Sequence, residues 1–461
     1  MRLNATSPQT CAIKRSKGIH QKVFLITAGL VILLLLGGCA VLTQLNPFAA
    51  TSTPTPSNQL PVQGSATPTA PPQAPTVTSQ TSTNHLILWI PPDFDPNSGT
   101  ASGDLLHERL DEFINAHPGL TIDVRIKAAA GPGGLLDSLS TTSAAAPGAI
   151  PSLVALPRAE METAALKGLI YPWNDLVQQG LTVDAYPYAL NLGKVQGTSY
   201  GLPFAGNALV MVYRPLQVVY APTSWNEYVT REFPVIFPAG DPEALVTTQM
   251  LLSLEQVEQK PPEMPQVDEA SLRKAYNVIN DGARSGTFPY WLADYDSFEK
   301  GYQAFLDNRA NYAVVWASSV LNRLPQNVSM ASLPAVNALP FTLADGWMWV
   351  LTNSSEDQRQ IIASLAESLM DDKFLGPWTE AANMLPTSQS VLKQWKNQTD
   401  AATINEVASS ARLIPSNEFS SSISPILQQG TLGMIRGQIN YLQALENSLK
   451  DLQLVNPTPG G

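Results

Sequence analysis

Cysteine is nearly absent from this sequence of 461 residues, which contains only Cys11 and Cys39. Because both precede residue 40, the rest of the chain can form neither a disulfide nor a thiolate metal site. A domain without such cross-links must owe its stability to a hydrophobic core. The roughly 370 residues after position 84 are enough for a large core, and that length favours two domains.

Positive charge is scarce as well. The chain has 27 Lys and Arg against 38 Asp and Glu, a formal net charge of −11. Five of the basic residues and none of the acidic ones precede Cys39, so the chain from Cys39 onward carries 22 − 38 = −16. An acidic surface argues against nucleic acid and anionic lipid headgroups as partners.

Catalytic and cofactor motifs are also missing. After Cys39 the histidines are His85, His107 and His117, whose spacing does not suit a metal site, so no metal is expected. The glycine-rich segment 131–134 does not match the phosphate-loop pattern, and the chain has no Gly-x-Ser-x-Gly nucleophile elbow. We therefore expect no cofactor and no enzymatic activity.

The N-terminus has the pattern of an export signal. Basic residues between Lys14 and Lys22 precede an apolar run from Val23 to Leu36. A run of about 14 residues forms about 21 Å of helix, whereas a bilayer core of about 30 Å needs about 20 residues. The run therefore predicts a cleaved signal segment rather than a permanent span. A slightly short anchor helix that extends through Leu42 is the alternative.

The tetrapeptide Leu36-Gly37-Gly38-Cys39 resembles the lipobox of bacterial lipoproteins. The resemblance implies a signal peptide over 1–38, cleavage before Cys39 and a diacylglycerol on its thiol. One acyl chain holds a protein at a membrane only marginally, whereas two hold it firmly. We therefore expect an extracytoplasmic protein with a lipid anchor in the cell membrane.

The segment from Thr51 to Asn84 is uncharged and consists mostly of Thr, Ser, Pro, Gln and Ala. Such a composition cannot bury enough apolar surface to offset the entropy cost of ordering. We expect residues 39–84 to comprise the lipidated Cys and a disordered spacer, and 456–461 to form a disordered tail.

Hydrophobic periodicity predicts strands and helices in alternation after this spacer. The first series has strands at 86–90, 120–126 and 153–156 and helices at 106–114, 135–145 and 158–166. The second has strands at 208–213, 235–237, 312–316 and 347–351 and helices at 272–279, 298–305, 358–370 and 434–452. Alternation of this kind predicts a mostly parallel α/β sheet.

Five short segments follow one another in order: 151–156, 197–204 (Gly-Thr-Ser-Tyr-Gly-Leu-Pro-Phe), 222–227 (Pro-Thr-Ser-Trp-Asn-Glu), 305–315 and 385–387 (Leu-Pro-Thr). Together they resemble the family 1 extracellular solute-binding proteins, the maltose-binding-protein-like receptors of ABC importers. In that family the second, third and fifth segments read Gly-x-x-Tyr-Gly-Leu-Pro, Pro-x-Thr-Trp-Asp-Glu and Leu-Pro-Thr. The resemblance extends from Leu86 to Leu452.

The resemblance implies an α/β fold of the periplasmic-binding-protein type, with two lobes, hinge crossovers and a ligand cleft between the lobes. Lobe one would comprise 85–204 and 346–390, and lobe two 205–345 and 391–455. The implied function is that of a monomeric receptor that closes on a small solute, a carbohydrate, and delivers it to the permease subunits of an ABC importer.

Three sets of positions depart from the family pattern. Asn308, Asn311 and Tyr312 replace the usual Gly, Ala and Met. Trp316 and Ser318 stand where the family has Gly and Trp, and Asp345 precedes Gly346 in place of Gly-Gly. These positions face the cleft in the family, so the resemblance identifies no particular sugar.

Aromatic side chains are the main candidates for ligand contact, because their faces stack on the C–H faces of sugar rings. Trp291 lies in a dense aromatic cluster next to two acidic residues, Trp316 ends a predicted strand, and Trp347 follows the second crossover. Each could equally pack against its own domain, since one face of a strand usually meets the core.

The other candidates follow from position. Asp93 and Phe94 come directly after the first strand, and loops at strand ends line ligand clefts in α/β folds. Phe204 and Asn207 flank the first crossover, and Asp345 lies at the second. The predicted ligand-binding residues are therefore Asp93, Phe94, Phe204, Asn207, Trp291, Trp316, Asp345 and Trp347.

Two other functions stay open. A lipoprotein of this kind could sense its ligand for a membrane kinase without transporting it. The acidic pairs Asp294/Asp296 and Asp371/Asp372 could in principle hydrolyse glycosides at the cell surface. Neighbouring permease genes would separate transport from sensing, and turnover of a chromogenic glycoside would reveal a hydrolase.

Overall fold

The computed structural model describes residues 85–177, 183–231, 233–253, 267–336, 339–352 and 356–455. The predictions for the signal peptide, Cys39, the spacer and the tail lie outside these residues. Ser79–Gly461 forms one compact unit, separate from Met1–Thr78. Within the described ranges, no helix is both long enough and apolar enough to cross a membrane.

The strands alternate with helices along most of the chain, as the sequence predicted. They are β1 (His85–Ile90), β2 (Thr121–Ile126), β3 (Leu153–Pro157), β4 (Lys194–Val195), β5 (Thr198–Ser199), β6 (Gly201–Tyr213), β7 (Val235–Ile236), β8 (Tyr312–Trp316), β9 (Ser329–Ala331), β10 (Thr342–Leu351) and β11 (Ala411–Leu413). The main sheet has the order β2-β1-β3-β10-β6-β8-β7, with β11 paired to β10 and β9 paired to β6.

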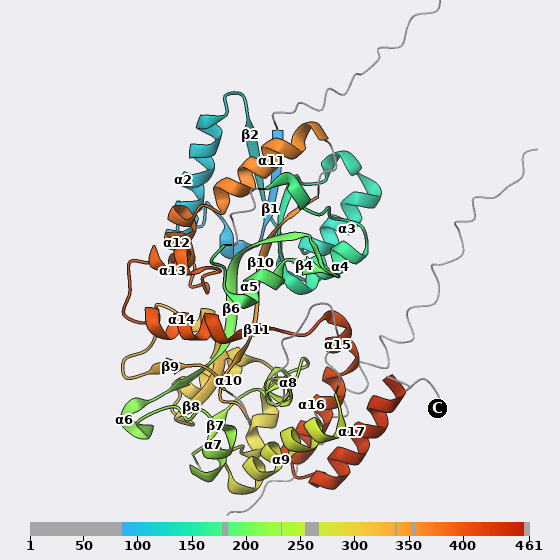
Figure 1. The fold of residues 1–461 in the computed structure, drawn as a ribbon, viewed down its shortest axis with the longest axis vertical. Helices are drawn as coiled ribbons and strands as arrows, with labels where there is room; N and C mark the ends of the chain where they lie inside the picture. The colour runs from blue at the N-terminus through green and yellow to red at the C-terminus, as the bar shows by residue number, and fades with distance from the viewer. Residues whose placement is uncertain are drawn as a thin grey trace, which may run out of the picture. The chain divides into compact units, whose positions relative to one another are not determined.

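The α-helices cover both faces of this sheet (Figure 1). They are α2 (Ala101–Ala116), α3 (Leu135–Ala145), α4 (Arg158–Leu166), α5 (Pro187–Leu192), α6 (Pro215–Val218), α7 (Trp225–Arg231), α8 (Leu245–Leu252), α9 (Glu269–Ser285), α10 (Phe298–Leu306), α11 (Glu356–Leu369), α12 (Asp372–Ala381), α13 (Gln389–Lys393), α14 (Ala401–Ser410), α15 (Asn417–Ser422), α16 (Ser424–Ile435) and α17 (Tyr441–Val455).

Lobe one, at the top of Figure 1, is built on the parallel strands β1, β2 and β3. Helices α2, α11 and α12 pack on one side of them, and α3 and α4 pack on the other. Parallel strands joined by helices need both faces covered, which explains why β1 and β3 are apolar along most of their length.

Lobe two, at the bottom of Figure 1, contains the parallel strands β7 and β8 and the short strand β9. Helices α7, α8, α9 and α10 pack around them, and α16 and α17 pack beside α9. The predicted last helix over 434–452 corresponds to α17, but its predicted start is too early, because α17 begins at Tyr441. Gly437 adopts a left-handed conformation with φ of +65°, which separates α16 from α17.

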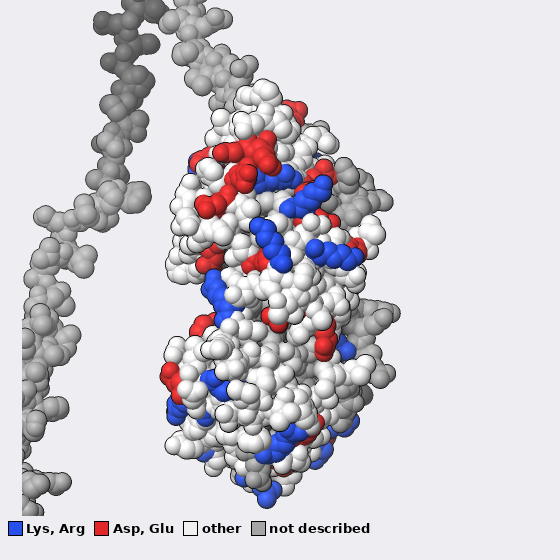
Figure 2. All heavy atoms as spheres, turned by 90° about the vertical axis from the view of Figure 1, so that its left-hand side faces the viewer, with Lys and Arg blue, Asp and Glu red and all other residues white. Residues whose placement is uncertain are grey.

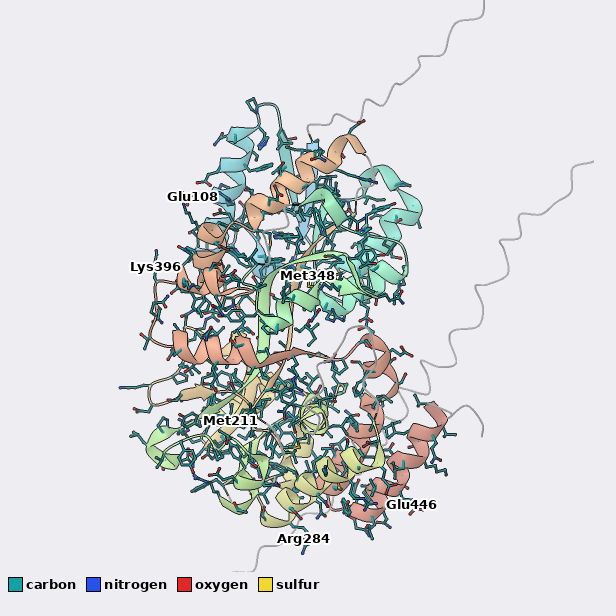
Figure 3. All side chains as sticks on the ribbon, in the orientation of Figure 1. Glu108, Met211, Arg284, Met348, Lys396 and Glu446 are labelled. Atoms are coloured by element: carbon teal, nitrogen blue, oxygen red, sulfur yellow. The ribbon has the colours of Figure 1, made fainter. Side chains whose placement is uncertain are left out.

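The antiparallel strands β6 and β10 run from one lobe into the other. In Figure 3, Met211 of β6 lies in lobe two and Met348 of β10 lies in lobe one. Both strands begin earlier than predicted, at Gly201 and Thr342. The first residues of both strands include glycine, asparagine or aspartate, which have low strand propensity, so the sequence pattern did not predict strand there. Pairing of the two strands with each other overrides that preference.

Aromatic side chains fill the core of lobe one. Phe204 stacks on Trp349 with ring centroids 4.4 Å apart, and Phe94 meets Trp378 edge to face at 5.1 Å. A bulge in β6 makes this possible: Trp347 pairs with Ala205, but the next residue of β10 pairs with Pro203. The extra residue turns Phe204 toward the same core as Ala205, which strict alternation would not allow.

Candidate ligand-binding site

The crossing strands bring four of the predicted residues together. Asn207 of β6 pairs with Asp345 of β10, and Leu209 of β6 pairs with Trp316 of β8. Paired residues point to the same side of a sheet, and so do residues two apart on one strand. Asn207, Trp316, Asp345 and Trp347 therefore share one face, and all four side chains are partly exposed. We name these four residues the crossing-strand group.

Asn207 and Asp345 form the polar centre of this group, and Asn207 connects this centre to lobe two. Its Nδ2 donates to Ser318 Oγ at 2.9 Å, and its Oδ1 accepts from the backbone N–H of Ser318 at 3.0 Å. Ser318 lies in the short 3-10 helix Ala317–Ser319 that follows β8. The Asn207 side chain is thus oriented by three fixed atoms before any ligand arrives, since Ala208 N–H also donates to it.

Asp345 connects the same centre to lobe one. Burial raises the pKa of its carboxyl, although hydrogen bonds from the backbone N–H groups of Gly346 and Arg158 and the charge of Arg158 act in the opposite direction. Its Oδ1 is buried and has no hydrogen-bond partner in the described structure. A buried carboxylate oxygen without a partner is costly, so this atom favours a donor supplied from outside.

The Arg158 guanidinium bonds to the protein through Nη1, whereas its buried Nε has no hydrogen-bond partner in the described structure. Its Nη1 donates to the carbonyl oxygens of Asn191, Leu192 and Lys194 at 3.2, 2.8 and 3.3 Å. Burial is also the main cause that lowers its pKa. The sequence left open whether Arg158 would pair with an anionic ligand or begin a solvated helix. In the structure its Nη1 joins the start of α4 to the segment 191–194 within lobe one.

The two tryptophans of the group lie on either side of the polar centre. Trp347 meets Phe94 edge to face at 5.0 Å, and Trp316 meets Phe298 edge to face at 5.7 Å. Their strand partners on β6 are four residues apart, which corresponds to about 13 Å at about 3.3 Å per residue. The group is therefore longer than a single sugar ring.

Two predicted residues lie in the core instead. Phe94 and Phe204 are each 1% exposed and pack against Trp347, Trp349 and Trp378. The bulge and the tight packing of the short 3-10 helix Pro92–Phe94 leave neither ring with an open face. In this structure they support Trp347 and do not form part of the exposed surface. Asp93 beside them is exposed at the carboxyl end of β1.

Among the described residues, Trp291 makes no ring contact with the crossing-strand group. Trp291 lies between α9 and α10, edge to face with Tyr295 at 5.8 Å and beneath the Arg309 guanidinium at 4.7 Å. Arg309 also donates to the Tyr295 hydroxyl at 2.7 Å. These contacts explain the aromatic cluster as local packing within lobe two.

One acidic residue near the group was absent from the sequence prediction. Glu243 follows β7 and lies two residues before α8 begins at Leu245. Burial among its neighbours raises its pKa, and the charges of Asp241 and Asp345 add to that rise. Helix α8, which follows Glu243 in the chain, contacts β10, the strand that carries Asp345. The rule that loops at strand ends line ligand sites could have identified Glu243.

One residue of each acidic pair considered for hydrolysis has a structural role. Asp296 forms an ion pair with Lys300 at 2.7 Å, and Asp371 caps the N-terminus of α12 by accepting from two backbone N–H groups. Among the described residues, no group of three or more His, Cys, Asp or Glu could hold a metal ion. Figure 2 shows acidic and basic side chains interspersed on one face of the molecule.

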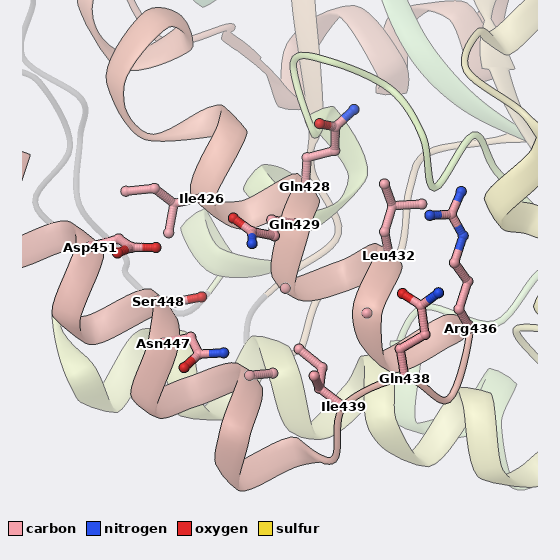
Figure 4. Close-up of a pocket in the computed structure, with 13 residues that line it drawn as sticks. Ile426, Gln428, Gln429, Leu432, Arg436, Gln438, Ile439, Asn447, Ser448 and Asp451 are labelled. Atoms are coloured by element: carbon pink, nitrogen blue, oxygen red, sulfur yellow. The ribbon is translucent and has the colours of Figure 1, made fainter.

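A surface cavity of about 320 Å³ lies away from the crossing strands, between α16 and α17 (Figure 4). Amide and hydroxyl side chains line it, among them Gln429, Asn447 and Ser448, with Asp451 at one end. Ser448 is already bonded to the Tyr276 hydroxyl at 2.8 Å.

Known structures share this fold. The cyclic α-maltosyl-1,6-maltose binding protein of Arthrobacter globiformis is 15% identical, with a TM-score of 0.64 over 80% of this chain and 98% of that one. The sugar-binding protein of Xanthomonas citri is 18% identical, with a TM-score of 0.64 over 81% and 98%. The maltose-binding periplasmic protein of Listeria monocytogenes, in complex with maltose, is 13% identical, with a TM-score of 0.65 over 82% and 99%.

These likenesses confirm the predicted two-lobed α/β fold of the maltose-binding-protein type. No curated protein matches the chain. The family model described as bacterial extracellular solute-binding protein matches residues 108–405, which is more than half of the chain and includes elements of both lobes and both crossing strands. This chain therefore belongs to the bacterial extracellular solute-binding proteins.

Proposed function

We propose that this protein is a lipid-anchored receptor that binds a carbohydrate between its two lobes and delivers it to an ABC importer. The observation that carries the proposal is the crossing-strand group: two partly exposed tryptophans on either side of a polar Asn207–Asp345 pair. Indole faces suit the apolar faces of sugar rings, and an oriented amide and carboxylate suit their hydroxyl groups.

The position of this group supports a role in lobe closure. Asn207 is bonded to lobe two through Ser318, whereas Asp345 interacts with Arg158 of lobe one. A ligand that contacts both residues gains more interactions when the lobes close around it, and differential contact of this kind is what shifts a two-state equilibrium.

The proposal is tested by a thermal-shift screen of neutral, amino and acidic oligosaccharides, followed by X-ray scattering with the best ligand. A ligand at 100 times its Kd should stabilise the protein by about 2.7 kcal/mol. Closure should reduce the radius of gyration. A scattering profile that is identical with and without a bound sugar, together with measurable turnover of that sugar, would contradict the receptor function.

Membrane anchoring rests on Leu36-Gly37-Gly38-Cys39 in the sequence. We expect Cys39→Ser to abolish lipid labelling and to shift the protein from the membrane to the soluble fraction of the cell. Normal acyl labelling of the variant would show that Cys39 is not the lipidated residue.

A further inference from the structure

Polar groups connect the two lobes directly at one side of the crossing strands. Asn417, the first residue of α15, donates from Nδ2 to the carbonyl oxygen of Ala159 at 2.7 Å and to Thr163 Oγ1 at 3.1 Å. Its backbone N–H donates to Glu162 Oε2 at 3.2 Å. All of these acceptors belong to α4, a helix of lobe one. A single residue thus ties the start of α15 to that helix.

Helix α15 itself belongs with lobe two. It packs against α16, which follows it in the chain and contacts α9. Phe419 of α15 is buried, so apolar packing fixes this short helix in place. Figure 1 shows α15 at the boundary of the lobes, with α4 above it and α16 below it. The hydrogen bonds of Asn417 therefore cross from one lobe to the other.

A second asparagine makes an equivalent contact on the other side of the crossing strands. Asn322, which follows β8 in lobe two, donates from Nδ2 to the carbonyl oxygen of Glu380 in α12 of lobe one at 2.9 Å. Its φ of +55° is a left-handed conformation that asparagine adopts more readily than most residues. In Figure 1, α12 lies at the left and α15 at the right, with β6 and β10 between them. Two amide side chains therefore bridge the lobes, one on each side of the crossover.

Bonds of this kind bias the arrangement of the lobes without locking it. Asn417 is partly exposed and Asn322 is exposed, so water can replace each bond when the lobes separate. A hydrogen bond that exchanges with water has a modest net effect, about fivefold in an equilibrium constant. The apparent affinity for a ligand scales with the fraction of molecules that already have the binding-competent arrangement.

We propose that Asn417 and Asn322 form a clasp that holds the two lobes together before any ligand is bound. The clasp raises ligand affinity because it increases the fraction of molecules whose lobes are already close. The inference goes beyond the proposed function, since it depends neither on the chemistry of the ligand nor on delivery to an importer. Loss of the clasp should weaken every ligand by the same factor, because its effect lies in the lobe equilibrium.

The test measures the distance between the lobes by double electron–electron resonance on the full chain in detergent, without ligand. Both native cysteines are replaced by serine, and spin labels are attached at Glu108→Cys on α2 and Arg284→Cys on α9. Figure 3 shows these two positions in lobe one and lobe two. We expect Asn417→Ala to increase the population at longer distances about fivefold. Asn322→Gly, which permits the same left-handed backbone, should act in the same direction.

Asn447→Ala is the matched control, because it removes an exposed asparagine amide from α17 within lobe two (Figure 4). Its distance distribution should equal that of the unaltered protein. Unchanged distances in Asn417→Ala overturn the clasp, as does a shift to shorter distances or an equal shift in the control. If Asn417→Ala lowers the melting temperature, Thr163→Val becomes decisive, because it removes an acceptor on the other lobe, and unchanged distances there overturn the clasp. Each of these results leaves the carbohydrate receptor standing.

Discussion

At the scale of single residues, the candidate site depends on which aromatic rings keep an open face. Trp316 and Trp347 are partly exposed on the crossing-strand group, whereas Trp349 and Trp378 are buried in the core of lobe one. All four are large apolar side chains in the same region of the fold. Exposure, and not residue type, therefore separates the candidates for ligand contact from the residues that support them.

Replacement of either exposed tryptophan should weaken ligand binding. Loss of the indole removes buried apolar area and a stacking contact, so Trp316→Ala and Trp347→Ala should each cost about 2 kcal/mol of binding free energy, roughly thirtyfold in Kd. Titration calorimetry with the best ligand of the screen measures this. Trp291→Ala is the matched control, because Arg309 and Tyr295 cover that ring. Unchanged Kd values in both variants would contradict the site.

Glu160 of α4 makes stability depend on pH. Burial raises its pKa to about 7, against a hydrogen bond from the backbone N–H of Leu136, and its Oε2 has no partner in the described structure. In the unfolded chain the pKa is about 4.3. Between these two values the folded protein binds more protons than the unfolded one, so this residue's contribution to stability falls as the pH rises from about 4.3 to 7.

Glu160→Gln should therefore stabilise the protein at pH 8, by on the order of 1 kcal/mol after solvent screening, and have little effect near pH 4. Urea unfolding at the two pH values measures the difference. Glu108→Gln on the exposed side of α2 serves as the control and should be neutral at both. An equal gain at both pH values would show that ionisation of Glu160 is not the cause.

At the scale of elements, the crossover depends on two glycines that face each other. Gly206 of β6 pairs with Gly346 of β10. A β-carbon on Gly346 would collide with the carbonyl oxygen of Ala205, which is backbone and cannot move aside. The close approach of the two strands at the point where they leave lobe one therefore requires glycine at this position.

Gly346→Ala should destabilise the protein by about 1–3 kcal/mol, because the strands must separate to admit the methyl group. Thermal unfolding followed by circular dichroism measures the loss. Gly148→Ala provides the control, since a β-carbon there meets nothing within 4 Å. If both variants melt at the same temperature as the unaltered protein, the crossing strands are less closely packed than the structure indicates.

At the scale of the whole molecule, Ser79–Gly461 forms a compact unit without the preceding residues. We expect a chain that begins at Asn84 to melt at the same temperature as one that begins at Ala40, because the intervening composition buries little apolar surface. Differential scanning calorimetry compares the two. A drop of several degrees on shortening would show that the spacer packs on the domain.

The sequence by itself determined the order of strands and helices and the two-lobed fold. Strong apolar runs such as Leu86–Ile90 and turn residues such as Pro118-Gly119 predict elements locally, because periodicity and turn chemistry act over a few residues. The order of five weak motifs was enough to identify solute-binding proteins. The sequence also indicated Asn207, Trp316, Asp345 and Trp347 as candidate ligand-binding residues, and the structure places these four together.

Only the tertiary structure decided which candidates share a face. Phe204 turned inward because of a bulge that depends on the partner strand, and Trp291 was covered by Arg309 from the far end of α10. Helix α8 came to lie against β10 although the two elements are about 100 positions apart in the chain. Strand register, bulges and long-range contacts are set by packing between distant segments, and no local pattern in a single sequence records them.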